Sequence, residues 1–127
     1  MLDPAELTKW LNKLLAAQPL IIVEGKKDEA TLRGLGFQRI MTLTKPLYAV
    51  VEDVASQTNA AVILTDLDAK GKELYGVLSD GLRRNGVLID DGFRRFLLRH
   101  TPLKHIEGLG TFVETVQKTS LRREMAG

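Results

Sequence analysis

The chain has 127 residues, 44% of them hydrophobic and 27% charged, a composition that fits one soluble globular domain over residues 1–127. No apolar run approaches the roughly 20 residues that a membrane-spanning helix needs, and the opening stretch MLDPAELTKW lacks the features of a secretory signal. The absence of cysteine excludes disulfides and thiolate metal sites, so we expect a cytoplasmic protein.

The net charge of +2 is distributed unevenly along the chain. Residues 1–80 contain nine Lys or Arg against eleven Asp or Glu, a balance of −2. Residues 81–127 contain nine against five, a balance of +4. Scattered basic charge is usually a solvated surface, but this excess also suits a face that binds a polyanion such as nucleic acid.

The first predicted element is a helix over residues 4–17. Asp3 suits the N-cap, Pro4 the first helical position and Glu6 a capping box. Leucines at helical spacing then form one apolar stripe, on which Trp10 is interpreted as a core residue rather than a ligand contact.

Strands and helices alternate over the middle of the chain. The predicted strands cover residues 20–23, 39–43, 61–65 and 87–89. The predicted helices cover residues 27–33, a segment opening at Pro46, and residues 70–84, the last with Leu74, Val77, Leu78 and Leu82 facing inward. Two further helices are expected at residues 93–99 and 112–118, separated by a break at 108–110. This order predicts an α/β fold, a Rossmann-like sheet of about four parallel strands flanked by helices.

Acidic side chains follow two of the predicted strands. The strand at 20–23 runs into Glu24, and the strand at 61–65 runs into Asp66 and Asp68. If the two strands are neighbours, the three carboxylates meet at one edge of the sheet, where parallel sheets bind ligands. Three unneutralised carboxylates repel one another, so we expect either that a cation joins them or that one of the acids stays protonated. Oxygen ligands without a nearby histidine favour Mg²⁺, and Glu24 is the candidate general acid or base.

Each of these residues also has a purely structural interpretation. Either aspartate could cap the helix that follows, and Glu24 could pair with Lys26 or Lys27 on the surface. The metal site is illusory only if all of these interpretations hold together.

Two stretches carry a resemblance to a known family. They are IIVEGKKDEATLRGLGF, residues 21–37, and ILTDLDAKGKEL, residues 63–74. Together they resemble the Toprim domain, which topoisomerases, bacterial primases, recombination-repair proteins, several nucleases and the ribonuclease that matures 5S ribosomal RNA share. The matching residues are Glu24, Gly25, Asp66, Asp68 and Gly71. The match covers about residues 19–100, leaving the helix at 4–17 and a basic C-terminal extension outside it.

The resemblance implies specific roles. Glu24 would be the general acid or base, and Asp66 and Asp68 would coordinate Mg²⁺, with Mn²⁺ as the alternative ion. Some relatives carry an acid directly after the glycine, where this chain has Lys72. Basic residues would bind the phosphates of the substrate: Lys26, Lys27, Lys70, Lys72, Arg94, Arg95 and Arg99.

The function expected from these features is Mg²⁺-dependent processing of RNA or DNA, by phosphodiester cleavage. The alternative is a non-catalytic nucleic-acid-binding adaptor in a larger replication, repair or RNA-processing complex. A homodimer is also compatible with the sequence. A haloacid-dehalogenase-like phosphatase ranks lower, because there the Asp-x-Asp pair follows the first strand. A nucleotide-binding Rossmann domain ranks lower still, because no Gly-rich loop follows the first strand.

Overall fold

The structure, a computed structural model, describes residues 2–126. Its helices are α1 Pro4–Ala17, α2 Lys26–Gly34, α3 Leu47–Gln57, α4 Ala69–Arg84, α5 Gly92–His100 and α6 Leu109–Ala126, with a 3₁₀ turn η1 at Ile106–Gly108. Its strands are β1 Leu20–Val23, β2 Ile40–Thr42, β3 Ala60–Ile63 and β4 Leu88–Ile89. Each predicted strand is therefore present: β1 has the predicted ends, and the ends of the others differ from prediction by at most two residues.

The four strands form one sheet in the order β2-β1-β3-β4, and every neighbouring pair is parallel. Ile22 of β1 is in register with Met41 of β2 on one side and with Ile63 of β3 on the other. This arrangement confirms the predicted Rossmann-like α/β fold. It also makes β1 and β3 neighbours, which was the condition for the predicted site.

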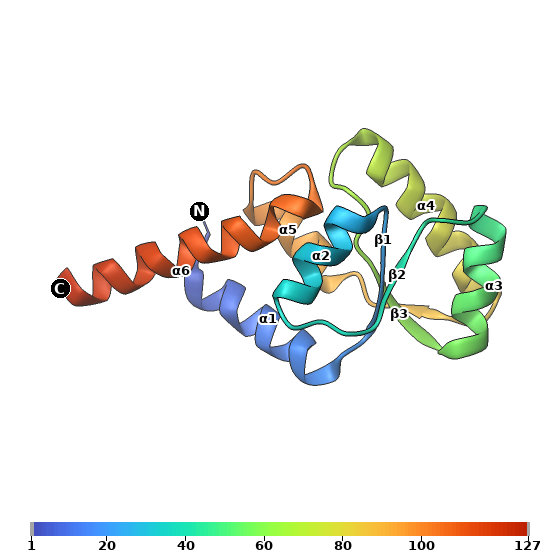
Figure 1. The fold of residues 1–127 in the computed structure, drawn as a ribbon, viewed down its shortest axis with the longest axis horizontal. Coiled ribbons are helices and arrows are strands. Elements are labelled where there is room, and N and C mark those ends of the chain that lie inside the picture. The colour runs from blue at the N-terminus through green and yellow to red at the C-terminus, as the bar shows by residue number, and fades with distance from the viewer. Residues whose placement is uncertain (1, 127) are drawn as a thin grey trace.

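Helices cover both faces of the sheet and bury two separate apolar clusters. On one face Ile21 and Val23 pack with residues of α1, α2, α5 and α6. On the other face Leu20 and Ile22 pack with residues of α3 and α4. The alternation along β1 follows from the two-residue period of a strand, and burial on both faces explains why its sequence is apolar throughout. Figure 1 shows α6 continuing past this body to the C-terminal end.

The first helix begins where the sequence predicts it, with the predicted N-cap residue. The Asp3 side chain accepts a hydrogen bond from the Ala5 N–H at 2.9 Å, and Pro4 opens α1. Trp10 packs against Phe93 and Phe96 of α5, which supports its interpretation as a core residue. Across residues 2–126, no helix has both the length and the apolar character needed to cross a membrane.

Two local predictions are wrong. Val77 is 57% exposed, whereas Leu78 and Leu82, which were also predicted to face inward, are buried. The predicted break at residues 108–110 is limited to η1, and Gly110 lies inside α6. Helix α6 is correspondingly longer than the segment 112–118 that the sequence predicted.

Candidate functional site

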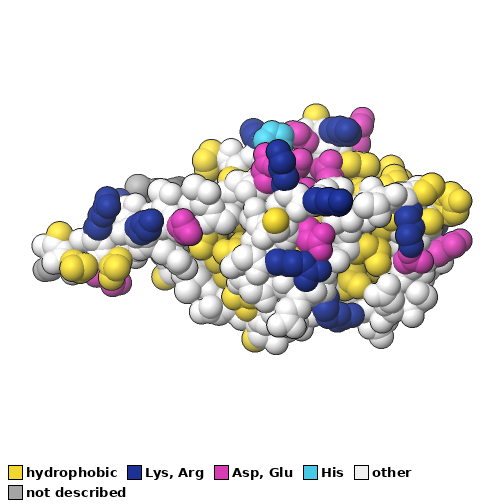
Figure 2. Space-filling model, viewed as in Figure 1, with side chains coloured by type: hydrophobic (Ala, Val, Ile, Leu, Met, Phe, Trp, Pro, Cys, Tyr) yellow, Lys and Arg dark blue, Asp and Glu magenta, His cyan; other side chains and the backbone are white. Residues whose placement is uncertain are grey.

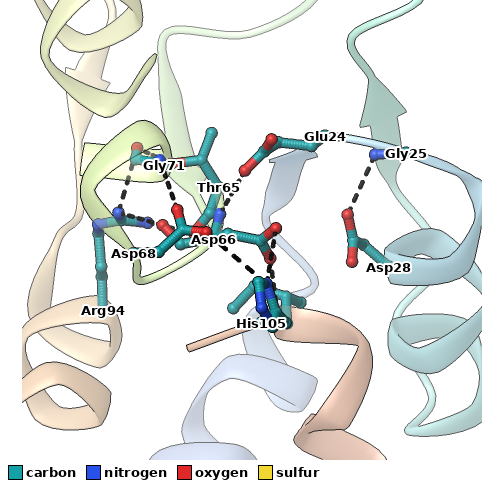
Figure 3. Close-up of polar contacts among 10 residues, drawn as sticks. Glu24, Gly25, Asp28, Thr65, Asp66, Asp68, Gly71, Arg94 and His105 are labelled. Carbon is teal, nitrogen blue, oxygen red and sulfur yellow. Dashed lines mark hydrogen bonds and ion pairs between the residues drawn. The ribbon is translucent and has the colours of Figure 1, made fainter. Parts of the chain in front are cut away.

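The acidic residues after β1 and β3 meet at the carboxyl edge of the sheet. The Glu24 carboxylate accepts a hydrogen bond from the Asp66 backbone N–H at 2.7 Å, as Figure 3 shows. From β1, the chain places β2 on one side and then β3 and β4 on the other, so β1 and β3 flank the point at which the strand order switches. Open α/β sheets bind ligands at such a switch point, outside the carboxyl ends of the strands. Glu24 therefore lies beside the start of the loop that carries Asp66 and Asp68, and its contact is to the Asp66 backbone rather than to either aspartate carboxylate.

A buried polar cluster holds the loop that follows β3. The Arg94 guanidinium, on α5, donates hydrogen bonds to the carbonyl oxygens of Thr65 at 2.6 Å and Asp66 at 3.0 Å. The Thr65 hydroxyl donates to the carbonyl of Gly71 at 2.7 Å, and Arg94 reaches that same oxygen at 3.4 Å. These contacts fix the main chain that carries the aspartates.

The prediction that Arg94 belongs to a phosphate-binding surface is wrong. Arg94 is only 3% exposed, and its guanidinium lies over the ring of Tyr75, 4.8 Å from the centroid. Burial lowers its pKa, but an arginine keeps its charge in proteins. Arg94 therefore supports the main chain of the loop after β3 from the protein interior and is not available to bind a phosphate in solution.

Gly71 allows two segments of backbone to approach closely. A Cβ atom at this position would lie 1.8 Å from the Asp66 carbonyl oxygen and 2.4 Å from its carbonyl carbon. The Gly71 N–H also donates to the Asp68 side chain at 2.8 Å, which makes Asp68 the N-cap of α4. Asp68 thus caps the helix, as its structural interpretation predicted, but only one of its two carboxylate oxygens does so.

A histidine joins the aspartate pair, which the sequence analysis did not expect. His105 Nδ1 lies 3.4 Å from Asp66 Oδ2 and 3.8 Å from Asp68 Oδ2. The hydrogen bond with Asp66 raises the pKa of His105, and the charge of Asp68 acts in the same direction. Asp66, Asp68 and His105 each offer a ligand atom, all within 4.8 Å of one another. The Glu24 carboxylate lies outside that group, so its role as a metal ligand stays a prediction.

An open cleft of about 320 Å³ lies over the site. Its lining residues are Glu24, Gly25, Lys26, Lys27, Asp28, Asp66, His105 and Glu107. Figure 2 shows acidic and basic side chains side by side around a histidine at the upper edge of the molecule. The exposed Lys26 and Lys27 are therefore placed where the sequence analysis expected phosphate-binding residues.

The other predicted phosphate-binding residues are exposed but lie outside this cleft lining. Lys70 and Lys72 lie in the first turn of α4. Arg95 and Arg99 line a separate depression of about 290 Å³ beside Trp10. Within residues 2–126, Arg95 is the one member of this group with an acidic partner, because its Nε lies 3.4 Å from Asp91.

Asp28 is a fourth carboxylate at the site, and it was not among the predicted site residues. It is only 8% exposed, and it accepts a hydrogen bond from the Gly25 N–H at 3.1 Å. Burial raises the pKa of Asp28 above its ordinary value, and the nearby charges of Asp66 and Glu24 raise it further. Its position in the first turn of α2, three residues after Gly25, was the available sequence signal.

Asp28→Asn is expected to increase the free energy of unfolding at neutral pH, measured by urea denaturation in the presence of a chelator. The raised pKa means that the folded protein disfavours the charged carboxylate, so the contribution of Asp28 to stability is complete below pH 3.8 and is lost as the pH rises through its folded pKa. Asparagine keeps an oxygen for the Gly25 N–H and carries no charge. The gain should shrink as the pH falls toward 3.8. A gain of equal size for the exposed Glu52→Gln control would contradict this explanation.

Comparisons with known proteins place the chain in a family. No family model matches it. The chain is 38% identical over 113 residues to a UPF0292 protein of Pyrococcus abyssi, covering 88% of this chain and 85% of that protein. It is 37% identical over 113 residues to a UPF0292 protein of Pyrococcus horikoshii, with the same coverage of both chains. A solved structure, a putative protein from Aquifex aeolicus, has a TM-score of 0.73 and 30% identity over 80% of this chain and 95% of that chain. The first two matches show that the chain belongs to the UPF0292 family.

Proposed function

We propose that this protein is a divalent-metal-dependent, Toprim-like protein that cleaves phosphodiester bonds in RNA or DNA. The observation that carries the proposal is the contact between Glu24 and the Asp66 N–H, which joins acids from two adjacent strands beside an open cleft. The cleft is lined by four acidic residues and by two exposed lysines, a combination that suits a bound cation together with a phosphate substrate. The cytoplasm is the proposed location.

The donor set fits a divalent ion. Asp66 and Asp68 supply carboxylate oxygens, which suit Mg²⁺ and Mn²⁺. A bound ion would supply positive charge for the negative charge that develops on the phosphate oxygens. Lys26 and Lys27 would bind the flanking phosphates, which gives affinity without sequence selectivity and makes binding weaken as salt increases.

Hydrolysis of a phosphodiester also needs proton transfer. Water adds to phosphorus, the bond from phosphorus to one sugar oxygen breaks, one proton leaves the water, and one proton joins the departing oxygen. Glu24 lines the cleft and is the group proposed to accept the proton from water. Its hydrogen bond to the Asp66 N–H holds the carboxylate in place for that role.

The test is cleavage of labelled RNA and DNA by the purified protein in Mg²⁺ or Mn²⁺. Glu24→Gln and Asp66→Asn are each expected to lower the rate at least about 100-fold, because they remove a proton acceptor and a metal-binding charge respectively. Both variants retain an oxygen acceptor, so the folded structure should persist. Glu52→Gln, an exposed change on α3, should leave the rate unaltered.

The outcomes separate the competing functions. Cleavage that persists in both variants would show a contaminating nuclease and contradict the proposal. Salt-sensitive binding without cleavage by the wild-type protein would favour the non-catalytic adaptor.

A further inference from the structure

The most informative feature beyond the proposed site is the placement of His105. It comes from the irregular segment between α5 and α6, 39 residues along the chain from Asp66. Its Nδ1 nevertheless faces one oxygen of each aspartate, at 3.4 and 3.8 Å (Figure 3).

Backbone hydrogen bonds fix the main chain on both sides of His105. The Leu67 N–H donates to the carbonyl of Lys104 at 2.8 Å, and the Ile106 N–H donates to Asp66 Oδ1 at 2.9 Å. Leu67 and Ile106 are themselves buried, at 1% and 0% exposure. The imidazole, though exposed, therefore extends from a backbone that the core holds in position.

In each of the two aspartates, one carboxylate oxygen accepts a backbone hydrogen bond and the other faces His105. Asp66 Oδ1 accepts from the Ile106 N–H, and Asp68 Oδ1 accepts from the Gly71 N–H. The Oδ2 atoms of both residues face His105. Hydrogen bonds to one carboxylate oxygen are a common means of orienting the other toward a metal ion.

We propose that Asp66, Asp68 and His105 bind a divalent first-row transition ion, for which Mn²⁺ is the probe, in preference to Mg²⁺. Imidazole nitrogen suits transition ions and is a poor ligand for Mg²⁺, which prefers oxygen. Metal–ligand bonds of about 2.1 Å at angles of 90–110° separate neighbouring ligand atoms by about 3.0–3.4 Å. The 3.4 Å distance from His105 Nδ1 to Asp66 Oδ2 lies in that range, and the 3.8 Å distance to Asp68 Oδ2 lies slightly above it. The inference rests on the proposed function only in taking Asp66 and Asp68 as metal ligands.

The charge of the surroundings also favours a cation at this point. Glu24, Asp28 and Glu107 line the same cleft as Asp66. Burial is the main cause that raises the pKa of Asp28, and the negative charges of its neighbours raise that pKa further. Three protein ligands leave coordination positions for water or for a phosphate oxygen.

The test is pulsed electron paramagnetic resonance of Mn²⁺ bound to protein that carries no polyhistidine tag. Coupling of the ion to a ¹⁴N nucleus is expected in the wild-type protein, and it should disappear in His105→Ala. His100→Ala, which removes the other histidine, should keep the coupling. Calorimetry should show Mn²⁺ binding tighter than Mg²⁺, and His105→Ala should weaken Mn²⁺ binding at least about tenfold while changing Mg²⁺ binding little.

The result that overturns the inference is one bound Mn²⁺ per chain without nitrogen coupling, displaced by Mg²⁺ at equal concentration. That result leaves the proposed cleavage standing, because an all-carboxylate site would then hold the ion. Conversely, nitrogen coupling in a protein that cleaves neither RNA nor DNA would support the inference and contradict the proposed function. The wild-type spectrum decides the question even if the His105 variant does not fold.

Discussion

Gly71→Ala is expected to lower the free energy of unfolding by about 3 kcal/mol or more, measured by urea denaturation. The added methyl carbon would lie 1.8 Å from the Asp66 carbonyl oxygen and 2.8 Å from its Cα. Backbone atoms cannot move aside as the end of a flexible side chain can. The loop that carries Asp66 would therefore shift, and the Arg94 and Thr65 hydrogen bonds would shift with it.

Gly76→Ala is the matched control for this variant. Gly76 lies in the same helix, and a Cβ there has no neighbour within 4 Å. This substitution should increase stability by about 0.5–1 kcal/mol, because alanine favours the helix interior over glycine. Equal effects of the two substitutions would show that the close contact with Asp66 carries no energy.

Arg94→Met is expected to destabilise the protein by about 2–4 kcal/mol, because it leaves buried carbonyl oxygens without donors. Methionine fills much of the same volume, so the loss reports mainly the hydrogen bonds to Thr65 and Asp66. The desolvation cost of the buried guanidinium disappears with it, which limits the effect. Urea denaturation measures the change.

The neighbouring Arg95→Met provides the comparison. The Arg95 side chain is 75% exposed, and its ion pair with Asp91 is a surface pair, so the change should stay within about 0.5 kcal/mol. A large effect at Arg95 and a small one at Arg94 would contradict the assignment of Arg94 to a buried supporting role.

The fold was predictable because several local signals agreed. The apolar run Leu20–Val23 is typical of a strand buried on both faces, and both of its faces are covered. Asp3 and Pro4 together predicted the start of α1. The prediction for Val77 was wrong because periodicity indicates which side of a helix is apolar but not how wide the buried part of that side is. The packing of α4 on α3 determines which residues at its border are buried.

The site was predictable only in part. Glu24 and Asp66 could be placed together because parallel strands end at the same edge of a sheet. His105 carried no such signal, since its position depends on how the irregular chain after α5 returns to the loop after β3. Arg94 did carry a signal, because it precedes the buried Leu97 by three residues and so shares its face of α5.

The sheet order has a consequence for how this unit can be combined with others. The inner strands β1 and β3 carry the acids, while the outer strands β2 and β4 have only three and two residues. Strands or whole domains appended along either outer edge would leave the spacing between Glu24 and Asp66 unaltered. The candidate site could therefore tolerate additions at both outer edges of the sheet without a change in its geometry.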